Sequence, residues 1–456
     1  MFRKVLVANR GEIALRVMNA CHELGIRTVA VYSEADREAL HVRYADEAIC
    51  IGPPRAADSY LNVPAVIAAA EIADVDAIHP GYGLLSENAN FAEVCRASNI
   101  KFIGPPPEAM RLMGEKEKAR QAMKKAKVPI LPGSDGVFAT VEEAEACAKK
   151  VGYPVILKAK AGGGGRGMRI VRDPADLPRL YHAAFSEAAN AFGNGELYME
   201  KFVENPRHIE FQMLADEHGH VASLFERECS IQRRHQKLIE ESPSLQVTAK
   251  LRDEIGKTLC RCLTDIGYQN AGTVEFVMDA NRKLYFIEMN TRIQVEHPVT
   301  EAISGVDLVK AQLRIAAGER LDTILPAKLE LRGHAIECRI NAENPKKFTP
   351  SAGKIEAFLV PGGNGIRVDT AQYTGGVVSP FYDSLVAKLI THGVSRDEAI
   401  ARMERALGQF HVRGIETSIS LQQAILRDTN FRSGEFDTGF MERFLAARAE
   451  EDKQSA

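Results

Sequence analysis

Short apolar runs alternate with longer amphipathic stretches over about the first 100 residues of the chain. The runs KVLVAN (4–9), RTVAVYS (27–33) and DAIHPGYG (76–83) have the length of strands, and helices are predicted from about Gly11 to Leu24 and within residues 60–73. Strands and helices that take turns at this spacing predict a parallel, doubly wound α/β sheet. Ligands of such sheets bind at the carboxyl ends of the strands.

Polar or glycine-rich segments follow two of these predicted strands. NRGE (9–12) comes after the first strand, and HPGYG (79–83) comes after a later one. The proline and glycines of HPGYG hold it out of a helix, so Tyr82 is presented on a loop, and Ser86 is the predicted N-cap of the next helix. A turn with a purely structural role is the alternative interpretation.

A glycine-rich loop lies between two strand-like runs in the next part of the chain. A charged helix is predicted at residues 115–127, and Pro129 should end it at a domain boundary. Beyond it come YPVILKA (153–159), GGGGRG (162–167) and MRIV (168–171). A P-loop and a dinucleotide fingerprint both need a helix after the glycines, so neither fits. The pattern favours a mobile hairpin whose N–H groups fold over phosphates, with a flexible linker as the alternative.

From about residue 198 the predicted strands follow one another closely. They are LYMEKFV, HIEFQMLA, ASLFERE, GTVEFVM and LYFIEMN. This spacing predicts an antiparallel sheet, with a helix at about 251–267 before the last two runs. HAIECRINAE, KIEAFLV, SPFYDSLVAKLITHG and a helix near 396–408 predict a further α+β portion, and the charged end AEEDKQSA is predicted to be disordered.

The last two of these closely spaced runs each carry a glutamate, Glu275 and Glu288. DANRK between them is predicted to be a turn, and a hairpin with its loop at 280–283 sets the two glutamates directly opposite each other. Opposed Cβ atoms lie roughly 4.5–5.5 Å apart, where like charges destabilise a sheet. A divalent cation such as Mg²⁺ or Mn²⁺ would remove this penalty. Glutamates of a half-buried strand that pair with lysines are the alternative.

Glu288 also begins an alternating polar series, which continues with Asn290, Arg292, Gln294 and Glu296. If this stretch is extended, all five polar side chains line one face and the residues between them line the other. Five aligned polar groups favour a functional site over a solvated strand.

Other polar residues complete a predicted nucleotide clamp. Lys116, Lys158 and the glycine loop supply cations and N–H donors, Glu200 and the backbone of residues 201–203 face a planar base, and His208 and Gln232 follow on neighbouring strands. Lysines that hold phosphates, and metals that bridge the β and γ oxygens, point to ATP. Taken singly, each of these residues is better explained as a surface lysine or a hydrogen-bonded core histidine, and only the group favours a nucleotide site.

A second anion site is predicted from RRHQK (233–237) together with Arg292, Gln294 and Glu296. An arginine beside a carboxylate could hold a small anionic nucleophile while Glu296 removes its proton. Arg339 in ECRINAE could stabilise negative charge on another substrate, a role worth on the order of 3 kcal/mol. The alternative for RRHQK is a solvated basic strand.

Composition narrows the class of protein. A chain of 456 residues with 45% hydrophobic content can bury a large core in about three domains. Lys+Arg 58 against Asp+Glu 61 leaves a net charge of −3, so no basic excess attracts nucleic acid or a membrane surface. The eight cysteines form no C-x-x-C pair, which indicates reduced thiols in the cytoplasm. The start of the chain matches neither a signal peptide nor a membrane span.

Together these motifs resemble the ATP-grasp superfamily and, within it, the biotin carboxylases, over essentially the whole chain. The resemblance rests on NRGEIA (9–14), HPGYG (79–83), SEN (86–88), GGGGRGM (162–168), ENPRHIE (204–210), RRHQK (233–237), EMNTRIQVEHPVTE (288–301), ECRINAE (337–343) and FYDS (381–384). It implies ATP- and bicarbonate-dependent carboxylation of biotin on a carrier protein by way of carboxyphosphate.

The resemblance also implies roles for individual residues. Those that bind ATP are Lys116, Lys158, Gly163, Gly164, Gly165, His208 and Gln232, with Glu200, Lys201 and Val203 at the adenine. Those that ligate two Mg²⁺ or Mn²⁺ ions are Glu275, Glu288 and Asn290. Those that hold bicarbonate are Arg292, Gln294 and Val295, with Glu296 as general base. Lys237 and Arg339 stabilise phosphate and biotin enolate charge, and Tyr82 flanks the biotin pocket.

The implied architecture has five parts. A doubly wound, Rossmann-like N-terminal domain (1–114) leads through a linker helix (115–130) to a small glycine-loop lid domain (131–203). A C-terminal ATP-grasp domain (204–446) and a disordered tail (447–456) follow. Without a Met-Lys-Met segment or a carboxyltransferase, the chain is expected to be a free-standing homodimeric subunit with a biotin carboxyl carrier protein and carboxyltransferase subunits as partners.

The carboxyl acceptor is the finer prediction. Acetyl-CoA carboxylase, and with it fatty acid biosynthesis, is the first hypothesis, and a two-subunit pyruvate or other 2-oxo acid carboxylase is the alternative. Two further hypotheses are an acyl-phosphate-forming ATP-grasp ligase and a silent nucleotide-binding subunit. Lys160, Leu84 and Ser242 depart from the family pattern, and none of them removes a catalytic group.

Overall fold

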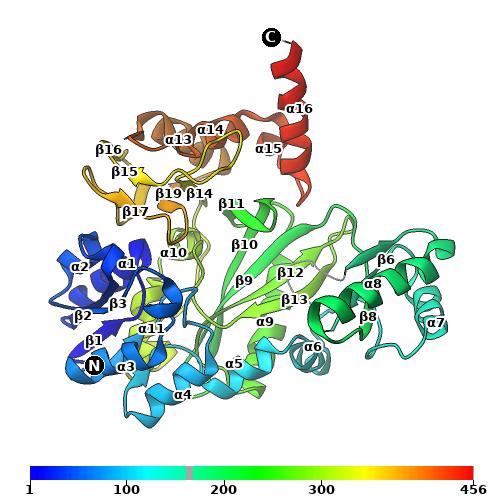
Figure 1. The fold of residues 1–456 in the computed structure, drawn as a ribbon, viewed down its shortest axis with the longest axis horizontal. Helices are drawn as coiled ribbons and strands as arrows, with labels where there is room; N and C mark the ends of the chain where they lie inside the picture. The colour runs from blue at the N-terminus through cyan, green and yellow to red at the C-terminus, as the bar shows by residue number, and fades with distance from the viewer. Residues whose placement is uncertain (161–167, 455–456) are drawn as a thin grey trace. The chain divides into compact units, whose positions relative to one another are not determined.

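The computed structural model describes residues 1–160 and 168–454, whose helices and strands are labelled in Figure 1. The chain forms two compact units. Unit 1 comprises residues 1–128, 207–276 and 288–456, and unit 2 comprises residues 129–206 and 277–287. The predicted phosphate-covering glycines Gly163, Gly164 and Gly165 lie outside the described residues. The five-part division derived from the sequence stays a prediction.

Unit 1 begins with a parallel sheet of strand order β3-β2-β1-β4-β5. Its strands are β1 (Lys4–Val7), β2 (Arg27–Ser33), β3 (Glu47–Gly52), β4 (Ala77–His79) and β5 (Lys101–Phe102). The helices around it are α1 (Gly11–Glu23), α2 (Leu40–Tyr44), α3 (Val63–Ile72), α4 (Ala89–Ala97) and α5 (Pro107–Gly114), with short 3₁₀ turns at Glu34–Asp36 and Ala56–Asp58. The predicted parallel sheet is confirmed, although β3 and α2 were not foreseen.

Both faces of this sheet are buried. Val5 and Val7 of β1 share one core cluster with Ile13 of α1. Leu6, which points to the other face, shares a second cluster with Val66 of α3. Helices therefore cover both faces, as a doubly wound sheet requires.

The HPGYG segment follows β4 as a loop. Gly81 has φ +63°, and a Cβ at this position would lie 2.8 Å from the Asn9 side chain. The Asn9 amide donates to the carbonyls of Pro80 (2.7 Å) and Tyr82 (2.8 Å). Glycine is therefore needed for a close approach that ties this loop to the end of β1.

The predicted N-cap at Ser86 is wrong. Helix α4 begins at Ala89, and the Asn88 side chain accepts a hydrogen bond from the Phe91 N–H at 2.9 Å. Asparagine and serine are similarly good N-caps, so local sequence offers both residues, and only the register of α4 selects one.

The large sheet of the chain has strand order β13-β12-β9-β10-β11-β14-β19-β17, and it is antiparallel from β9 to β17, as predicted. Its strands are β9 (Arg207–Ala215), β10 (Val221–Arg233), β11 (Gln236–Ser242), β12 (Asn270–Met278), β13 (Leu284–Asn290), β14 (His334–Asn341), β17 (Ile366–Thr370) and β19 (Leu385–Gly393). Helix α9 (Ala249–Asp265) packs against β10 and β9. This sheet carries most of the predicted site residues.

RRHQK is a hairpin turn, not a continuous basic strand. Gln232 pairs with Lys237 and Arg233 with Gln236, so β10 and β11 are joined by Arg234 and His235 alone. Both turn residues have positive φ, +48° and +66°. This two-residue geometry matches the twist of the flanking strands and sets Lys237 directly opposite Gln232.

The extended stretch predicted from Glu288 to Glu296 ends early. Strand β13 stops at Asn290, and bends and a turn lead from Thr291 to α10 (His297–Ser304). Pro298 lies in the first turn of α10, where its fixed φ favours a helix start. The polar series therefore reaches the site partly from a strand and partly from the turn before a helix.

The remaining helices and strands of unit 1 complete its cores. They are α6 (Lys116–Lys125), α11 (Leu308–Ala316), α12 (Leu321–Ile324), β15 (Gly353–Lys354), β16 (Ala357–Leu359), β18 (Val377–Val378), α13 (Arg396–Gln409), β20 (His411–Arg413), α14 (Ile419–Arg427), α15 (Thr429–Ser433) and α16 (Phe440–Gln454). Helix α13 packs on β19 and β14. No helix in the described part of the chain is long and apolar enough to cross a bilayer.

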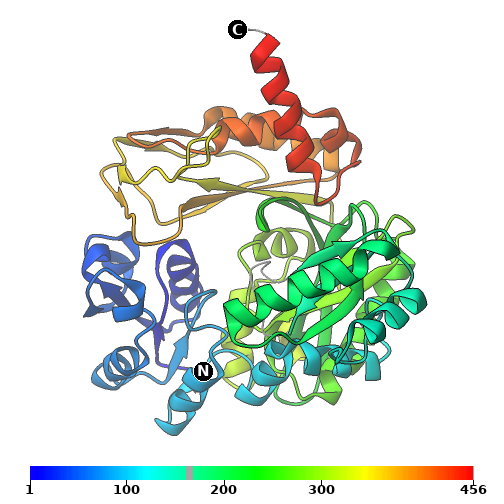
Figure 2. The same ribbon diagram turned by 45° about the vertical axis from the view of Figure 1, so that its right-hand side comes forward.

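Helix α16 (Phe440–Gln454) runs into the segment 447–456 that the sequence predicts to be disordered. Helix α16, drawn in red in Figure 2, continues to Gln454. Alanine, glutamate, arginine and lysine are strong helix formers, so a charged end of this composition extends a helix that Phe440 and Met441 anchor in the core.

Unit 2 contains a three-stranded sheet of order β7-β6-β8. Its strands are β6 (Val155–Ala159), β7 (Arg169–Val171) and β8 (Leu197–Lys201), and its helices are α7 (Val141–Val151) and α8 (Leu177–Phe192), with a 3₁₀ turn at Pro174–Asp176. Both helices contact this sheet, as Figure 1 shows. Strands β6 and β7 are antiparallel, which confirms the predicted strands on either side of the glycine loop.

A buried ion pair in the large sheet should make stability depend on pH. Glu241 of β11 lies 2.6 Å from Arg396 Nε and 2.8 Å from His334 Nε2. Burial raises the pKa of Glu241, but these partners outweigh it and lower the pKa to about 2. Since an unfolded glutamate titrates near about 4.3, this group stabilises the folded state above that pH, and the contribution disappears as the pH falls towards 2.

The full shift of the Glu241 pKa corresponds to about 3 kcal/mol. Urea unfolding should therefore show wild type more stable than Glu241→Gln near neutral pH, with a gap that shrinks below about pH 4. A gap that stays constant over the acid range would contradict the assignment.

Candidate active site

Lys237 is the centre of the candidate site. Its Nζ lies 2.6 Å from Glu210, 3.1 Å from Glu275 and 2.6 Å from Glu296. Burial lowers the pKa of this lysine, but the three carboxylates outweigh burial, and the net pKa is raised well above its usual value. The ammonium group therefore stays charged and gathers three carboxylates that lie far apart in the sequence.

Glu275 is held by several polar partners. His208 Nε2 lies 3.0 Å from one of its oxygens, and the side-chain amides of Asn290 and Gln294 donate to the other at 2.8 Å and 2.7 Å. Burial raises the pKa of Glu275, yet Lys237 and His208 lower it well below its usual range. Glu275 is therefore ionised.

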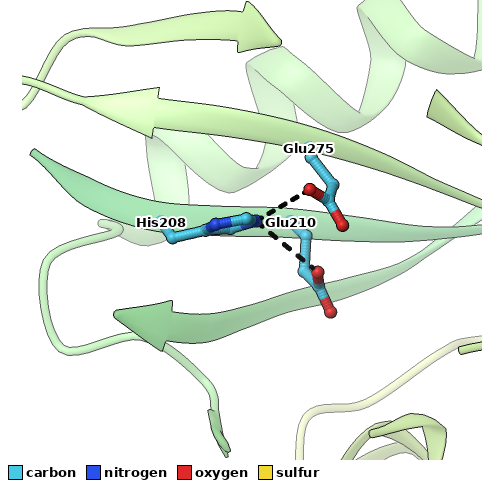
Figure 3. A group of neighbouring side chains, drawn as sticks. All are labelled: His208, Glu210 and Glu275. Atoms are coloured by element: carbon cyan, nitrogen blue, oxygen red, sulfur yellow. Dashed lines mark ion pairs between the residues drawn. The ribbon is translucent and has the colours of Figure 1, made fainter. Parts of the chain in front are cut away.

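His208, Glu210 and Glu275 form a compact ligand set, shown in Figure 3. One nitrogen or oxygen atom from each lies within 4.8 Å of the others. His208 points between the two carboxylates, at 3.0 Å from Glu275 and 3.9 Å from Glu210. The sequence predicts Glu275 as a metal ligand and His208 as an ATP-binding residue. It does not single out Glu210, although Glu210 ends the quoted motif ENPRHIE.

Glu288 fits a cation site with Glu275. Its side chain reaches solvent, but nearby protein atoms desolvate the carboxyl group and Glu275 repels it, and both effects raise the pKa of Glu288. A divalent cation would relieve this repulsion. Asn290 lies beside Glu275, to which its amide N–H donates, while its amide oxygen accepts from Arg292. Glu275, Glu288 and Asn290 thus have the donor chemistry that Mg²⁺ prefers.

A second cation, Arg339 of β14, contacts Glu296 from another side. Its guanidinium donates to Glu240 at 2.6 Å and to Glu296 at 2.9 Å. Burial raises the pKa of Glu296, but Lys237, Arg339 and Arg227 lower it well below its usual range. Glu296 is therefore ionised, which is the state that a general base requires.

Glu240 is a buried carboxyl group with a different pKa. Burial raises the pKa of Glu240 to about 7, even though Arg339 opposes the shift. Two carboxylates thus share Arg339, and Glu296 is the more acidic of the two.

Arg227 lies fully buried behind the site, and sequence analysis missed it. Its guanidinium donates to Glu210 (2.5 Å), Gln212 (2.8 Å), Thr300 (2.9 Å), Thr273 (3.2 Å) and Gln294 (2.8 Å). These contacts orient two site residues, Glu210 and Gln294. The available signal was an arginine inside the otherwise strand-like run ASLFERE.

The other predicted anion-binding residues lie near this centre. Arg292 donates to Glu87 at 3.0 Å and to the Asn290 side-chain oxygen at 3.0 Å. The Val295 carbonyl accepts a hydrogen bond from Lys388 at 3.1 Å. Gln232 lies on β10 directly opposite Lys237.

Tyr82 contacts a buried acid at the edge of the site. Its hydroxyl donates to Glu12, the last residue of the NRGE segment (9–12) that follows the first strand. Burial and the Glu12 charge raise the pKa of Tyr82 well above its usual value, so the phenol stays protonated.

The predicted adenine residues belong to unit 2. Lys158 of β6 and Glu200 of β8 form an ion pair. The Lys201 ammonium donates to the carbonyls of Gly152 (2.9 Å) and Tyr153 (2.8 Å), and Val203 is half-buried. Lys116 belongs to unit 1, where it begins α6 and is exposed.

The three departures from the family pattern are accommodated. Lys160 is exposed and lies 3.2 Å from Glu196. Leu84 adopts a positive φ of +45°. The buried Ser242 hydroxyl donates to the Glu226 carbonyl at 2.6 Å, so this position gains a hydrogen bond that alanine could not make.

Family models match three consecutive parts of the chain. They are "Biotin carboxylase, N-terminal domain" at residues 1–110, "Carbamoyl-phosphate synthase L chain, ATP binding domain" at 115–324, and "Biotin carboxylase C-terminal domain" at 337–443.

Known proteins and solved structures also match nearly the whole chain. The chain is 54% identical over 446 residues to biotin carboxylase 1 of Bacillus subtilis, with 97% of this chain and 99% of that protein covered. It is 53% identical over 445 residues to a pyruvate carboxylase subunit of Methanothermobacter thermautotrophicus, with 97% and 90% covered. It matches the crystal structure of the Hydrogenobacter thermophilus 2-oxoglutarate carboxylase biotin carboxylase domain, a dimer in complex with MgADP, ADP and bicarbonate, with TM-score 0.89, 53% identity, and 97% and 98% covered.

The fold, the buried acid-base cluster and these matches define an ATP-dependent ligase with an ATP-grasp domain. Within that class, the chain belongs to the biotin carboxylase family. The family resemblance and the fold class predicted from the sequence are therefore confirmed.

Proposed function

We propose that this biotin carboxylase transfers bicarbonate-derived CO₂ to biotin on a carrier protein, as the first half-reaction of acetyl-CoA carboxylase. The observation that carries the chemistry is the ionised Glu296 held between Lys237 and Arg339. A base flanked by two cations suits a reaction in which one anion is deprotonated beside another.

Glu296 is the proposed general base for bicarbonate. Arg292, Gln294 and the Val295 backbone would hold the anion while Glu296 accepts its proton. The bicarbonate oxygen then attacks the γ-phosphorus of ATP, its bond to the bridging oxygen of ADP breaks, and carboxyphosphate forms. Lys237, which stays charged, would stabilise the negative phosphoryl oxygens.

Arg339 and Tyr82 are proposed to act on biotin. Carboxyphosphate breaks down to CO₂ and phosphate. The released phosphate takes the proton of the biotin ureido nitrogen, and this nitrogen attacks CO₂. The Arg339 guanidinium would stabilise the enolate oxygen, and Tyr82 would flank the ring. Exclusion of water from this step would limit hydrolysis of carboxyphosphate.

ATP is the proposed nucleotide. His208, Gln232, Lys116 and Lys158 would contact phosphates and sugar, with Gly163, Gly164 and Gly165 over the phosphates and Glu200, Lys201 and Val203 at the adenine. A bound Mg²⁺ would neutralise charge on the β and γ oxygens, and Mn²⁺ is the alternative ion. Glu275, Glu288 and Asn290 are the proposed ligands, and the MgADP in the Hydrogenobacter structure supports magnesium.

Removal of one proposed ligand should change the magnesium requirement. Glu288→Gln should raise the Mg²⁺ concentration for half-maximal ATP cleavage about tenfold or more, because one of two carboxylates is lost. In wild type that concentration should also rise as the pH falls, since the raised pKa of Glu288 makes Mg²⁺ compete with a proton.

ATP cleavage at fixed total ATP and varied Mg²⁺ measures this requirement across the neutral and mildly acidic range. The variant should lose most of the pH dependence. An unchanged Mg²⁺ requirement in Glu288→Gln would remove this residue from the ligand set.

The acceptor and the assembly are further proposals. Acetyl-CoA carboxylase, and therefore fatty acid biosynthesis, is supported by the full-length match to a biotin carboxylase of 54% identity. A pyruvate or 2-oxo acid carboxylase remains the alternative, because relatives of 53% identity carry those names. A biotin carboxyl carrier protein, carboxyltransferase subunits, a homodimer like the Hydrogenobacter domain and a cytoplasmic location complete the proposal.

ADP release from MgATP tests the function directly. We expect turnover that depends on bicarbonate and rises with free biotin. Turnover without either dependence would favour another ATP-grasp ligase, and no turnover would favour a silent subunit. Reconstitution with carrier protein and each candidate carboxyltransferase would then identify the acceptor.

A further inference from the structure

Lys388, in the middle of β19, is a lysine with no exposed surface. Its strand neighbours are Arg339 of β14 and Asp369 of β17, which lie directly opposite it and share its face of the sheet. Its Nζ lies 3.1 Å from Glu12 and 3.7 Å from Asp369. Burial lowers the pKa of Lys388, but the surrounding carboxylates outweigh burial and raise it, so the ammonium is charged.

The same ammonium group reaches two parts of the site. It donates to the Val295 carbonyl at 3.1 Å, within the turn that leads to Glu296. Through Glu12 it reaches Tyr82, whose hydroxyl donates to the Glu12 carboxylate. One buried cation thus connects the backbone of the proposed bicarbonate segment with the side chain that flanks the proposed biotin position.

Stability alone does not explain this arrangement. Both members of the pair are buried, with Glu12 6% and Lys388 0% exposed. The desolvation cost of a buried ion pair is large, and well-packed apolar residues of similar volume are often at least as stable. Asp369 does not depend on Lys388 either, because Arg367 donates to both of its oxygens at 2.7 Å and 2.6 Å.

We propose that Glu12 and Lys388 form a positioning pair that holds Tyr82 and the Val295 carbonyl at a fixed separation. The pair thereby fixes the position of biotin relative to the carboxyl donor. The proposal rests on the proposed function and names two residues that act through Tyr82 and Val295 without touching substrate. Glu12 governs the biotin side, and Lys388 governs both sides.

This division predicts distinct kinetic signatures. Glu12→Leu removes the acceptor of Tyr82 and should raise KM for free biotin about tenfold with KM for bicarbonate nearly unchanged. Glu12→Gln keeps an oxygen for Tyr82 and should restore most of the biotin affinity. Lys388→Met should raise KM for both biotin and bicarbonate. KM for MgATP should change little in all three variants, because neither residue contacts any of the proposed ATP ligands among the described residues.

The double variant Glu12→Leu/Lys388→Met separates positioning from stability. It leaves no uncompensated charge, so its melting temperature should stay close to that of wild type, while both KM values remain raised. The matched control is Glu241→Leu/Arg396→Met, which removes a buried ion pair from the opposite face of the same sheet. The control should retain wild-type KM values even if its melting temperature falls.

The experiment measures ADP release with MgATP, bicarbonate and free biotin, each varied in turn, alongside thermal melts. Wild-type KM values in the folded double variant, or equal biotin KM in Glu12→Leu and Glu12→Gln, would overturn the positioning pair alone. If the double variant does not fold, the comparison of biotin KM between Glu12→Leu and Glu12→Gln tests the positioning pair. Wild-type enzyme without biotin-stimulated turnover would instead overturn the proposed function and the pair together.

Discussion

Glu296→Gln is expected to lower bicarbonate-dependent ATP cleavage by about 10²–10⁴-fold, the usual contribution of a general base. Glutamine keeps the shape of the side chain and can still accept one hydrogen bond, but it cannot take the proton of bicarbonate. The loss should therefore appear in kcat, with KM for MgATP within about threefold of wild type.

The acidity of Glu296 gives this prediction a further consequence. With Lys237 at 2.6 Å and Arg339 at 2.9 Å, its carboxylate is a weak base. Anionic substrates that draw these two cations away would raise the basicity of Glu296 when bicarbonate arrives. We therefore expect the contacts that keep the group ionised to delay proton transfer until both anions are bound.

Single-turnover ADP formation with and without bicarbonate would measure the effect of Glu296→Gln. Glu241→Gln is the matched control, a buried carboxylate on the same sheet whose partners are Arg396 and His334. The control should keep wild-type turnover at neutral pH. Retention of more than about a tenth of the wild-type rate in Glu296→Gln would assign the base to another group.

Arg227→Met is expected to destabilise the folded protein by about 3–5 kcal/mol, the cost of leaving a buried ion pair without one partner. The guanidinium has no exposed surface and donates to five side chains. Methionine fills part of the volume but leaves the buried oxygens of Gln212 and Gln294 without their donor. Activity should fall as well, because Glu210 and Gln294 lose their orientation.

Urea unfolding monitored by circular dichroism measures this loss, with the midpoint and the slope compared between variants. The control is Arg320→Met, which removes an exposed arginine paired with Asp322 and should leave the midpoint unchanged. A loss of less than about 1 kcal/mol in Arg227→Met would show that water or neighbouring donors replace the guanidinium.

The local pattern of apolar and polar residues was sufficient to predict most strands of both sheets and most of the helices that pack on them. The alternation of strands and helices predicted the parallel sheet around β1, and closely spaced apolar runs predicted the antiparallel sheet, because hydrophobic periodicity is a property of neighbouring residues. The residues at which helices and strands begin and end did not follow from local pattern alone. Ser86 and Asn88 are both good N-caps, and an alternating polar series reads as a strand even where Pro298 begins a helix.

The sequence by itself determined the class of chemistry, since carboxylates, lysines and glycines in these motifs point to ATP and a divalent cation. Tertiary structure decided which charges meet. Glu296 lies 59 residues from Lys237 and 43 from Arg339, and nothing in the sequence connected Arg227 or Lys388 to the site. Ion-pair partners depend on strand order and register across the whole sheet, which hydrophobic burial sets over long range, so no local spacing encodes them.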